Sequence, residues 1–186
     1  ANSDKFDIIL NFSFDLPIFS LRCSNLYHYV SMSSPSSLFS DQFNSVFYQN
    51  PTHFAFLTYS QFKTFGIDFD QPVIISGGLS PSSFTFNDLP DDYMIWCGRI
   101  CPEKNLQLAI NLSNLTDTPL KVCGFIEDLN YWDYLKHSND INNIEYCGFL
   151  SGTDYHSIIS KAFVMLHTAS WNEAFGKVIL ESMLLG

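Results

Sequence analysis

Between residues 93 and 186, short apolar runs alternate with amphipathic stretches in a regular order. The apolar runs, which are typical of buried strands, cover residues 93–97, 120–123, 144–147 and 163–167. Stretches with apolar residues at helical spacing follow them, from Pro102 onward and over residues 130–137, 154–162 and 175–185. This alternation predicts a parallel sheet with right-handed crossovers, so we expect an α/β, Rossmann-like sheet flanked by helices.

The first 92 residues are rich in Ser, Phe and Asn and have a less regular pattern. The stretch 31–40 is expected to be a loop, either a solvated connection or a segment that faces a substrate. A helix is expected over 59–66, and short strands over residues 7–12, which should be buried, 26–30, 54–57 and 72–76. The two halves therefore differ in organisation.

The strongest boundary is the Pro-, Ser- and Asp-rich stretch 80–92, which we interpret as a linker between residues 1–79 and 93–186. The chain starts directly on a strand-like run and stops at Gly186, where the C-cap of a helix would lie. A parallel sheet of so few strands without a closing element is thin. We therefore expect a piece of a larger protein that lacks both ends, and the open sheet edge predicts self-association.

Composition and charge exclude several classes of protein. With 46% hydrophobic and only 15% charged residues among 186, the chain is not disordered. Its formal net charge of −10 argues against a general nucleic-acid binder and against docking on anionic lipid. No apolar run reaches the ~18 residues of a membrane span. The polar start 1–7 has no signal-peptide pattern. The cysteines considered next lead us to expect a cytoplasmic protein.

The chain has five cysteines, an odd number without a C-x-x-C pair. This pattern predicts reduced and mostly buried thiols. Cys97 and Cys101 are four residues apart, but no second pair of Cys or His completes a metal site. Structural thiols are therefore favoured over metal ligands.

Two charged turns follow predicted strands. The first, residues 98–104, reads G-R-I-C-P-E-K and stands between a strand and a helix. In doubly wound folds ligands bind outside the carboxyl ends of the strands. A guanidinium from Arg99 and an ammonium from Lys104, placed ahead of a helix N-terminus, would form a phosphate site.

The second turn, residues 171–181, follows the strand at 163–167 and opens the last helix. Glu173 and Glu181 are eight residues apart, at most roughly 12 Å along a helix axis, which spans the two ends of a nucleotide sugar. Gly176 lets backbone approach a ligand closely. A third strand end, residues 146–150, is suited to flank a flat base.

A purely structural interpretation of these turns also exists, because an acid before a helix stabilises its dipole and Lys177 with Glu181 forms an i,i+4 pair. Three of the nine basic residues nevertheless fall in these turns, namely Arg99, Lys104 and Lys177. In so acidic a chain, this clustering favours a local positive pocket for an anionic donor. We expect Arg99, Lys104, Glu173 and Glu181 around one cleft.

The segment G-R-x-x-P-E-K and the segment E-A-F-G-x-x-x-x-E at 173–181 resemble the retaining GT-B glycosyltransferases of family 4, whose E-x7-E motif the latter matches. The turn at 75–84 resembles the I-P-N-G-V-D…F turn of that family, with Gly77 in place of Asn. The stretches ILNFSFDLP, HYVSM, DLNYW, IEYCGFL and EAFGKVILES are most similar to cyanobacterial UDP-glucose:tetrahydrobiopterin glucosyltransferases.

This resemblance covers nearly the whole chain and implies a GT-B fold. Residues 1–79 would be the later part of an N-terminal, Rossmann-like acceptor domain, and residues 93–186 most of the C-terminal domain that binds the nucleotide-sugar donor. The family's Gly-rich loop near the true N-terminus and the strand and helix that complete the second sheet are missing from the sequence.

The resemblance also implies roles for the motif residues. Arg99 and Lys104 would hold the diphosphate and stabilise the leaving nucleotide, and Glu173 would bind hydroxyls of the transferred hexose. Glu181 would bind the ribose. The other donor-binding positions would be Gly98, Phe149, Leu150, Ala174, Phe175 and Gly176. His28 matches the first of two histidines common in the family and Ser31 replaces the second, so His28 either faces the acceptor or packs in the core.

The implied reaction is transfer of a hexose, glucose from UDP-glucose, with retention to a small acceptor such as tetrahydrobiopterin. The cations would replace a metal cofactor, and the D-x-D sequence at 68–70 lies outside the strand–helix repeat, which argues against a metal role. The alternatives are a mannosyl- or other glycosyltransferase that acts on a glycan or lipid, and a non-catalytic fragment that binds nucleotide sugars. Residues 1–92 carry three Lys and Arg against nine Asp, which disfavours an anionic lipid acceptor.

Overall fold

A computed structural model of the chain describes residues 5–186, so residues 1–4 of the polar start lie outside the described residues. The chain divides into two compact units. The first unit contains the residues up to Gly78 together with Asn172–Phe175, and the second contains Leu79–Trp171 and Gly176–Gly186. Residues 80–92, which the sequence marks as a linker, belong to the second unit in this division. Each unit is described by itself.

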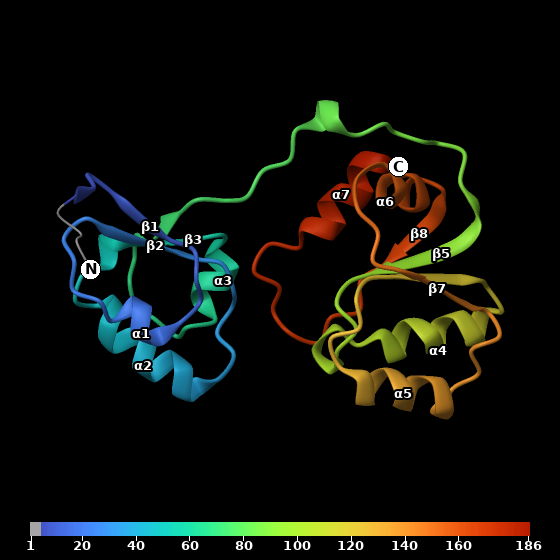
Figure 1. Cartoon of the computed structure of the whole chain (residues 1–186), viewed down its shortest axis with the longest axis horizontal. Helices are drawn as coiled ribbons and strands as arrows, with labels where there is room; N and C mark the ends of the chain where they lie inside the picture. Colours follow the sequence, from blue (N-terminus) through green and yellow to red (C-terminus); the bar gives the residue numbers. More distant parts are fainter. Residues whose placement is uncertain (1–4) are drawn as a thin grey trace. The chain divides into compact units, whose positions relative to one another are not determined.

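The first unit is a parallel sheet with strand order β1-β2-β3-β4. Helices α1 and α2 lie together along one face of it (Figure 1). Its elements are β1 (Ile9–Asn11), α1 (Leu16–Phe19), β2 (Leu26–Val30), α2 (Ser37–Phe47), η2 (Pro51–His53), β3 (Phe54–Phe56), α3 (Tyr59–Lys63) and β4 (Val73–Ile74). All four strands expected from the sequence are present; β2 has the predicted bounds and the other three are shorter than predicted.

Phenylalanine dominates the core of the first unit. Rings from β3, α2 and α3 pack together on the helix-covered side of the sheet, and Phe43 lies at their centre with no exposed surface. The buried members of this core are Phe19, Val30, Phe43, Phe47, Phe54, Phe56, Phe62, Phe65 and Ile67. The size of these rings lets a small sheet bury a substantial apolar area with few residues.

Two expectations for the first half are wrong. The predicted loop 31–40 gives way at residue 37 to helix α2, whose N-cap Ser36 accepts a hydrogen bond from the backbone N–H of Phe39 at 3.2 Å. The strand at 7–12 is not buried, because it forms the edge of a sheet covered on one face only. Its apolar side chains Leu10 and Phe12 are 62% and 63% exposed, while the polar Asn11 points inward.

The second unit is a parallel sheet with strand order β7-β6-β5-β8, in agreement with the predicted α/β fold. Its elements are η3 (Pro81–Ser83), β5 (Asp91–Cys97), η4 (Pro102–Lys104), α4 (Leu106–Thr116), β6 (Leu120–Cys123), α5 (Leu129–Ser138), β7 (Ile144–Gly148), α6 (Gly152–Ser160), β8 (Ala162–Leu166) and α7 (Lys177–Leu185). The chain moves outward from β5 to β7 and then returns to the other side of β5, so the strand order reverses there.

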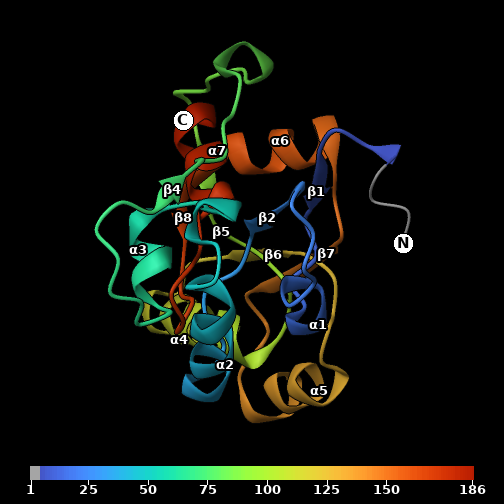
Figure 2. The ribbon, with the colours of Figure 1, turned by 90° about the vertical axis from the view of Figure 1, so that its left-hand side faces the viewer.

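Helices cover both faces of this second sheet. Figure 2 shows α6 and α7 on one side and α4 and α5 on the other, as Figure 1 does. Alternate residues of β5 serve the two cores: Met94 and Trp96 face α4 and α5, whereas Tyr93 and Ile95 face α6 and α7. Burial on both faces explains why the central strand β5 has four consecutive buried apolar residues, Tyr93–Trp96.

Candidate functional site in the second unit

A cavity of about 490 Å³ lies at the carboxyl ends of β5, β6 and β7, beside the first turns of α6 and α7. This is the edge at which parallel α/β sheets bind ligands, and the volume suits a small organic molecule. The lining residues are Cys97, Gly98, Arg99, Cys123, Gly124, Phe125, Phe149, Leu150, Ser151, Gly152, Tyr155, His156, Lys177, Val178 and Glu181.

Two helix N-termini reach this cavity. Ser151 and Gly152 at the start of α6, and Lys177 and Val178 at the start of α7, are among its lining residues. Neither helix has a side-chain hydrogen bond at its N-cap, although Asp154 lies in the first turn of α6. Because helix N-termini present backbone N–H groups and a positive dipole end, their convergence favours an anionic ligand.

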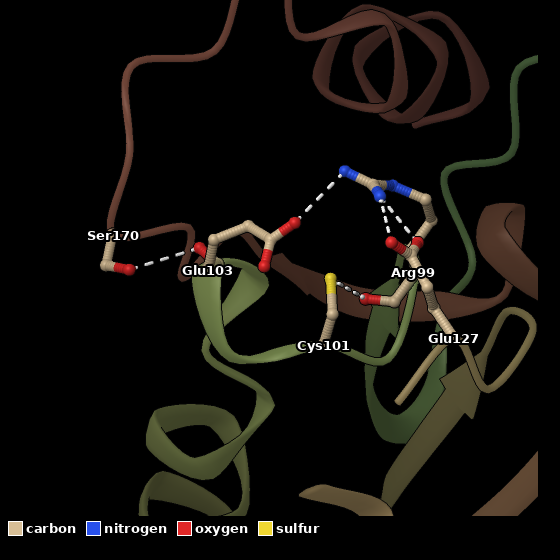
Figure 3. A network of polar contacts seen from close by, with 5 residues as sticks. All are labelled: Arg99, Cys101, Glu103, Glu127 and Ser170. Carbon is tan, nitrogen blue, oxygen red and sulfur yellow. Dashed lines mark hydrogen bonds and ion pairs between the residues drawn. The ribbon is translucent and has the colours of Figure 1, made fainter. Parts of the chain in front are cut away.

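Arg99 lies against two carboxylates (Figure 3). Its guanidinium donates to both carboxylate oxygens of Glu127, at 2.7 Å to Oε1, and to Oε1 of Glu103 at 3.2 Å. Partial burial disfavours the charged guanidinium, but the hydrogen bond and charge of Glu127 outweigh it and raise the pKa of Arg99. Arg99 is therefore a permanent cation whose fork is held in place at the cavity.

Glu181 is the buried acid of the cavity, with 7% of its surface exposed. The hydroxyl of Tyr155 on α6 donates to its Oε2 at 3.0 Å, and the ammonium of Lys177 lies 3.3 Å from its Oε1. Burial above all raises the pKa of Tyr155, which keeps its hydroxyl protonated as a donor. Side chains from α6 and α7 thus each hold one oxygen of the Glu181 carboxylate.

The floor of the cavity is built from backbone in close contact. Gly124 has φ +149°, and a Cβ placed on it would lie 1.7 Å from the carbonyl oxygen of Gly98. No side chain fits in that space, so glycine is required at position 124 both for its backbone angle and for the approach of Gly98. The two turns that follow β5 and β6 therefore meet directly beneath the cavity.

Lys104 does not line this cavity. Its ammonium lies 5.1 Å from the centre of the Trp171 ring, a cation–π contact within the second unit. The loop between β8 and α7 is held against η4 by three hydrogen bonds: Thr168 Oγ1 donates to the carbonyl of Lys104 at 3.1 Å, and the N–H and hydroxyl of Ser170 donate to the carbonyl of Glu103. The approach to the E-x7-E segment is thereby fixed to the G-R-x-x-P-E-K turn.

Glu173, Ala174 and Phe175 belong to the first unit. The carbonyl of Ala174 accepts a hydrogen bond from Thr58 Oγ1 at 3.0 Å, and the Phe175 ring lies 3.0 Å from the position of a Cβ on Gly77. The segment is therefore held by packing against the first unit. Its role toward a donor stays a prediction.

Gly176 is the N-cap of α7 and has φ +73°, the left-handed conformation that glycine adopts without strain. It lies next to the cavity residue Lys177 but does not itself line the cavity. Of the predicted donor-binding residues, the cavity thus brings together Gly98, Arg99, Phe149, Leu150 and Glu181.

His28 is a core residue of the first unit, with 4% of its surface exposed. Its ring stacks on Phe54 at 4.7 Å and meets Phe19 edge-on at 5.3 Å, and its Nδ1 is 3.1 Å from the amide nitrogen of Asn11. Burial, assisted by His53, lowers its pKa to about 4. The ring is thus neutral near pH 7, and its side chain serves the packing of β2.

A cluster of possible metal ligands adjoins the site: atoms of Cys101, Glu103 and Glu127 lie within 4.8 Å of one another. Both carboxylates already pair with Arg99, so an organic cation offsets part of the negative charge of the cluster. Asp68 and Asp70 are exposed in a loop of the first unit.

Sequence reasoning missed several cavity residues. Gly124 and Phe125 directly follow β6, so their position at a strand end was a usable signal. Tyr155 gave no such signal, because its contact with Glu181 depends on the packing of α6 against α7.

Within residues 5–186 no helix is long and apolar enough to cross a membrane.

A comparison with protein-family models matches residues 84–186 to the family described as glycosyl transferases group 1. A comparison with the curated proteins gave no match. The matched residues make up more than half of the chain and include every lining residue of the cavity.

Solved structures share the fold at low sequence identity. AviGT4, a glycosyltransferase involved in avilamycin A biosynthesis, matches with a TM-score of 0.71 and 16% identity, over 97% of this chain and 53% of that one. Anabaena Alr3699/HepE in complex with UDP and glucose matches with a TM-score of 0.70 and 17% identity, over 86% of this chain and 50% of that one. TarM matches with a TM-score of 0.66 and 14% identity, over 90% of this chain and 36% of that one. The chain therefore spans about half or less of the length of these structures.

Proposed function

The chain belongs to the group 1 family of glycosyl transferases, and on that premise we propose that its second unit binds the nucleoside diphosphate of a sugar donor in the cavity described above. One observation carries the proposal: the N-termini of α6 and α7, the guanidinium of Arg99 and the ammonium of Lys177 all line one cavity with a buried acid. The negative charge of a diphosphate is complementary to the helix N-termini and the two cations. The hydroxyls of a ribose can donate hydrogen bonds to the buried carboxylate.

In this proposal Arg99 binds the diphosphate as a fork. Glu127 and Glu103 hold the guanidinium before the ligand arrives, so less side-chain freedom is lost on binding. As the sugar leaves, negative charge builds up on the diphosphate, and Arg99 with the helix N-termini stabilises it. Lys104 is proposed to add to this charge on the basis of the family resemblance.

Glu181 is proposed to accept hydrogen bonds from the ribose hydroxyls. Its carboxylate is oriented by Tyr155 and Lys177 before any ligand binds. The exposed ring of Phe149 and that of Phe125 stand at the rim, 70% and 46% exposed, where a nucleobase can stack on them.

The full reaction is proposed as transfer of glucose from UDP-glucose with retention, through an oxocarbenium-like transition state. Glu173 would bind hydroxyls of the hexose, with backbone contacts from Ala174, Phe175 and Gly176. Support comes from the match of 173–181 to the E-x7-E motif and from the HepE structure with UDP and glucose. Arg99 and Lys104 would make a metal unnecessary, and the cytoplasm is the compartment in which we expect the reaction.

Tetrahydrobiopterin or another small molecule is proposed as the acceptor, from the resemblance of the stretches ILNFSFDLP and HYVSM. A glycan or lipid acceptor is the alternative. The acidic balance of residues 1–92, with nine Asp against three Lys and Arg, favours a small acceptor over an anionic lipid. A full-length parent protein assayed with reduced pterins and with lipid or glycan acceptors decides between them.

Calorimetric titration of this chain with UDP, UDP-glucose and GDP-mannose tests the donor proposal. Saturable binding of UDP and UDP-glucose, with weaker binding of GDP-mannose, is expected. Absence of binding by every nucleotide would overturn the proposal, and tighter binding of GDP-mannose would replace glucose by mannose. Binding in this chain without transfer by the full-length parent would favour a non-catalytic nucleotide-sugar-binding role.

Glu181→Gln should weaken UDP binding about tenfold, because the amide cannot accept both ribose hydrogen bonds as a carboxylate does; this corresponds to about 1.4 kcal/mol. The shape of the side chain is kept, so folding should be preserved. Glu145→Gln is the matched control, because Glu145 is an exposed acid of the same unit that pairs with Lys121 at 3.4 Å. Equal affinities for UDP in both variants would remove Glu181 from the nucleoside site.

Glu173→Ala should weaken binding of UDP-glucose about tenfold and leave binding of UDP within about twofold, since only the hexose hydroxyls are lost as partners. Titration of both ligands into the same protein preparation measures the difference. If UDP and UDP-glucose lose affinity to the same extent, Glu173 does not contact the sugar.

A further inference from the structure

Three strands of the second sheet have the same dipeptide at their carboxyl ends. Cys97-Gly98 ends β5, Cys123-Gly124 ends β6, and Cys147-Gly148 ends β7. All three cysteines face the side of the sheet covered by α6 and α7, where they pack in one core. The cysteines therefore form a row along the carboxyl edge of the sheet. The number of cysteines alone indicates structural thiols, whereas this arrangement points to a further role.

Cys97 and Cys123 are direct partners in the parallel register of β5 and β6. Adjacent strands lie about 4.8 Å apart, which is within the Cα separations of about 4.4–6.8 Å that disulfides span. Both residues also line the same cavity. Each cysteine is the last or nearly the last residue of its strand, so a bridge requires movement of the strand ends only.

The environment distinguishes the two thiols. A hydrogen bond with Cys97 lowers the pKa of Cys123; burial opposes this, while Cys147 and the nearby Lys121 lower it further. The same hydrogen bond, together with burial, raises the pKa of Cys97. Cys123 is therefore the thiol of the pair that loses its proton more readily, which favours it as the attacking sulfur.

The cavity gives access to both sulfurs. Cys97 and Cys123 line it, and Cys97 is partly exposed whereas Cys123 has 2% of its surface exposed. A small neutral oxidant can therefore reach the sulfurs through the cavity. We propose that Cys97 and Cys123 are a reversible oxidation site in the floor of this cavity, with hydrogen peroxide as the oxidant.

The reaction balances in two steps. The Cys123 thiolate attacks peroxide, an S–O bond forms as the O–O bond breaks, and the leaving hydroxide takes up a proton to become water. Cys97 then attacks the resulting sulfenic acid; an S–S bond forms, the S–O bond breaks, and a second water leaves. The Cβ atoms must come closer than the strand spacing provides, and such bridges are readily reduced by thiols.

The test treats the intact chain with hydrogen peroxide, blocks remaining thiols with N-ethylmaleimide, and maps peptides by mass spectrometry. We expect the peptides of Cys97 and Cys123 to be joined, the mass to fall by two hydrogens, and dithiothreitol to reverse both changes. Cys97→Ser should leave a sulfenic acid on Cys123 that dimedone traps, and Cys101→Ser, the matched control, should form the bridge as before.

Several outcomes would overturn the inference: independent oxidation of all thiols, a bridge between Cys123 and Cys147, or joined peptides that thiols do not reduce. The peptide map of the unaltered chain tests the proposed bridge even if a variant misfolds. A separate arm rests on the proposed function: saturating UDP should slow bridge formation at least about tenfold. If UDP binds without slowing the reaction, the oxidation site is not in the nucleotide cavity; if UDP does not bind, the donor proposal fails and the peptide map still stands.

Discussion

Arg99→Ala is expected to bind UDP at least about thirtyfold more weakly than the unaltered chain, a loss of about 2 kcal/mol. A charge-assisted fork to the diphosphate is lost, and Glu127 and Glu103 lose the cation that now pairs with them. Both carboxylates, which do not line the cavity themselves, would then lack their cation and repel an anionic ligand nearby. Calorimetric titration with UDP measures the change.

Arg22→Ala is the matched control, since Arg22 belongs to the first unit and is not among the residues that line the cavity. Arg99→Lys separates charge from geometry, because it keeps one positive charge and loses the planar fork. We expect its affinity for UDP to fall between that of the unaltered chain and that of Arg99→Ala. Unchanged binding of UDP by Arg99→Ala would remove Arg99 from the diphosphate site.

Phe43→Ala should lower the free energy of unfolding of the first unit by about 3–5 kcal/mol, the usual cost of removing a fully buried phenyl ring. Phe43 has no exposed surface, and six other phenylalanine rings have their centres 4.6–6.4 Å from its own. A cavity at the centre of such a cluster cannot close without moving α2 from the sheet.

The distribution of tryptophan makes this measurable. All three tryptophans, Trp96, Trp132 and Trp171, belong to the second unit, so their fluorescence follows its unfolding by urea. Circular dichroism follows both units. Phe43→Ala should shift the dichroism transition while the fluorescence midpoint stays in place, and Phe12→Ala, which removes a 63% exposed ring, should cost less than about 1 kcal/mol. A dichroism transition unaffected by Phe43→Ala would contradict the assignment of this ring to the core.

The fold of the second half could be predicted because its pattern has a single physical cause. Strands buried on both faces must be apolar throughout, and the amphipathic helices between them must cover both faces, so order and period define the sheet. The first half was harder. Helix α2 carries Phe39, Phe43 and Phe47 at a spacing of four, but the serine-rich start of the segment hid that period.

The site could be predicted where it depends on strand ends and not where it depends on helix packing. Arg99 and Phe149 follow strands of one parallel sheet, so topology alone brings them to one edge. The pairing of Arg99 with Glu127 depends on two loops that run side by side, joined by a bridge between Ile100 and Ile126. Contacts of this kind have no periodic signature in the sequence.

The glycine contact beneath the cavity limits how donor choice can be altered in the laboratory. Any residue larger than glycine at position 124 must displace the turn of Gly98, so libraries that randomise this position will consist mainly of variants with a distorted binding site. Variation at Phe125 and Phe149 meets no such barrier, because both rings are substantially exposed. Engineering of nucleobase preference should therefore begin with these two aromatic positions.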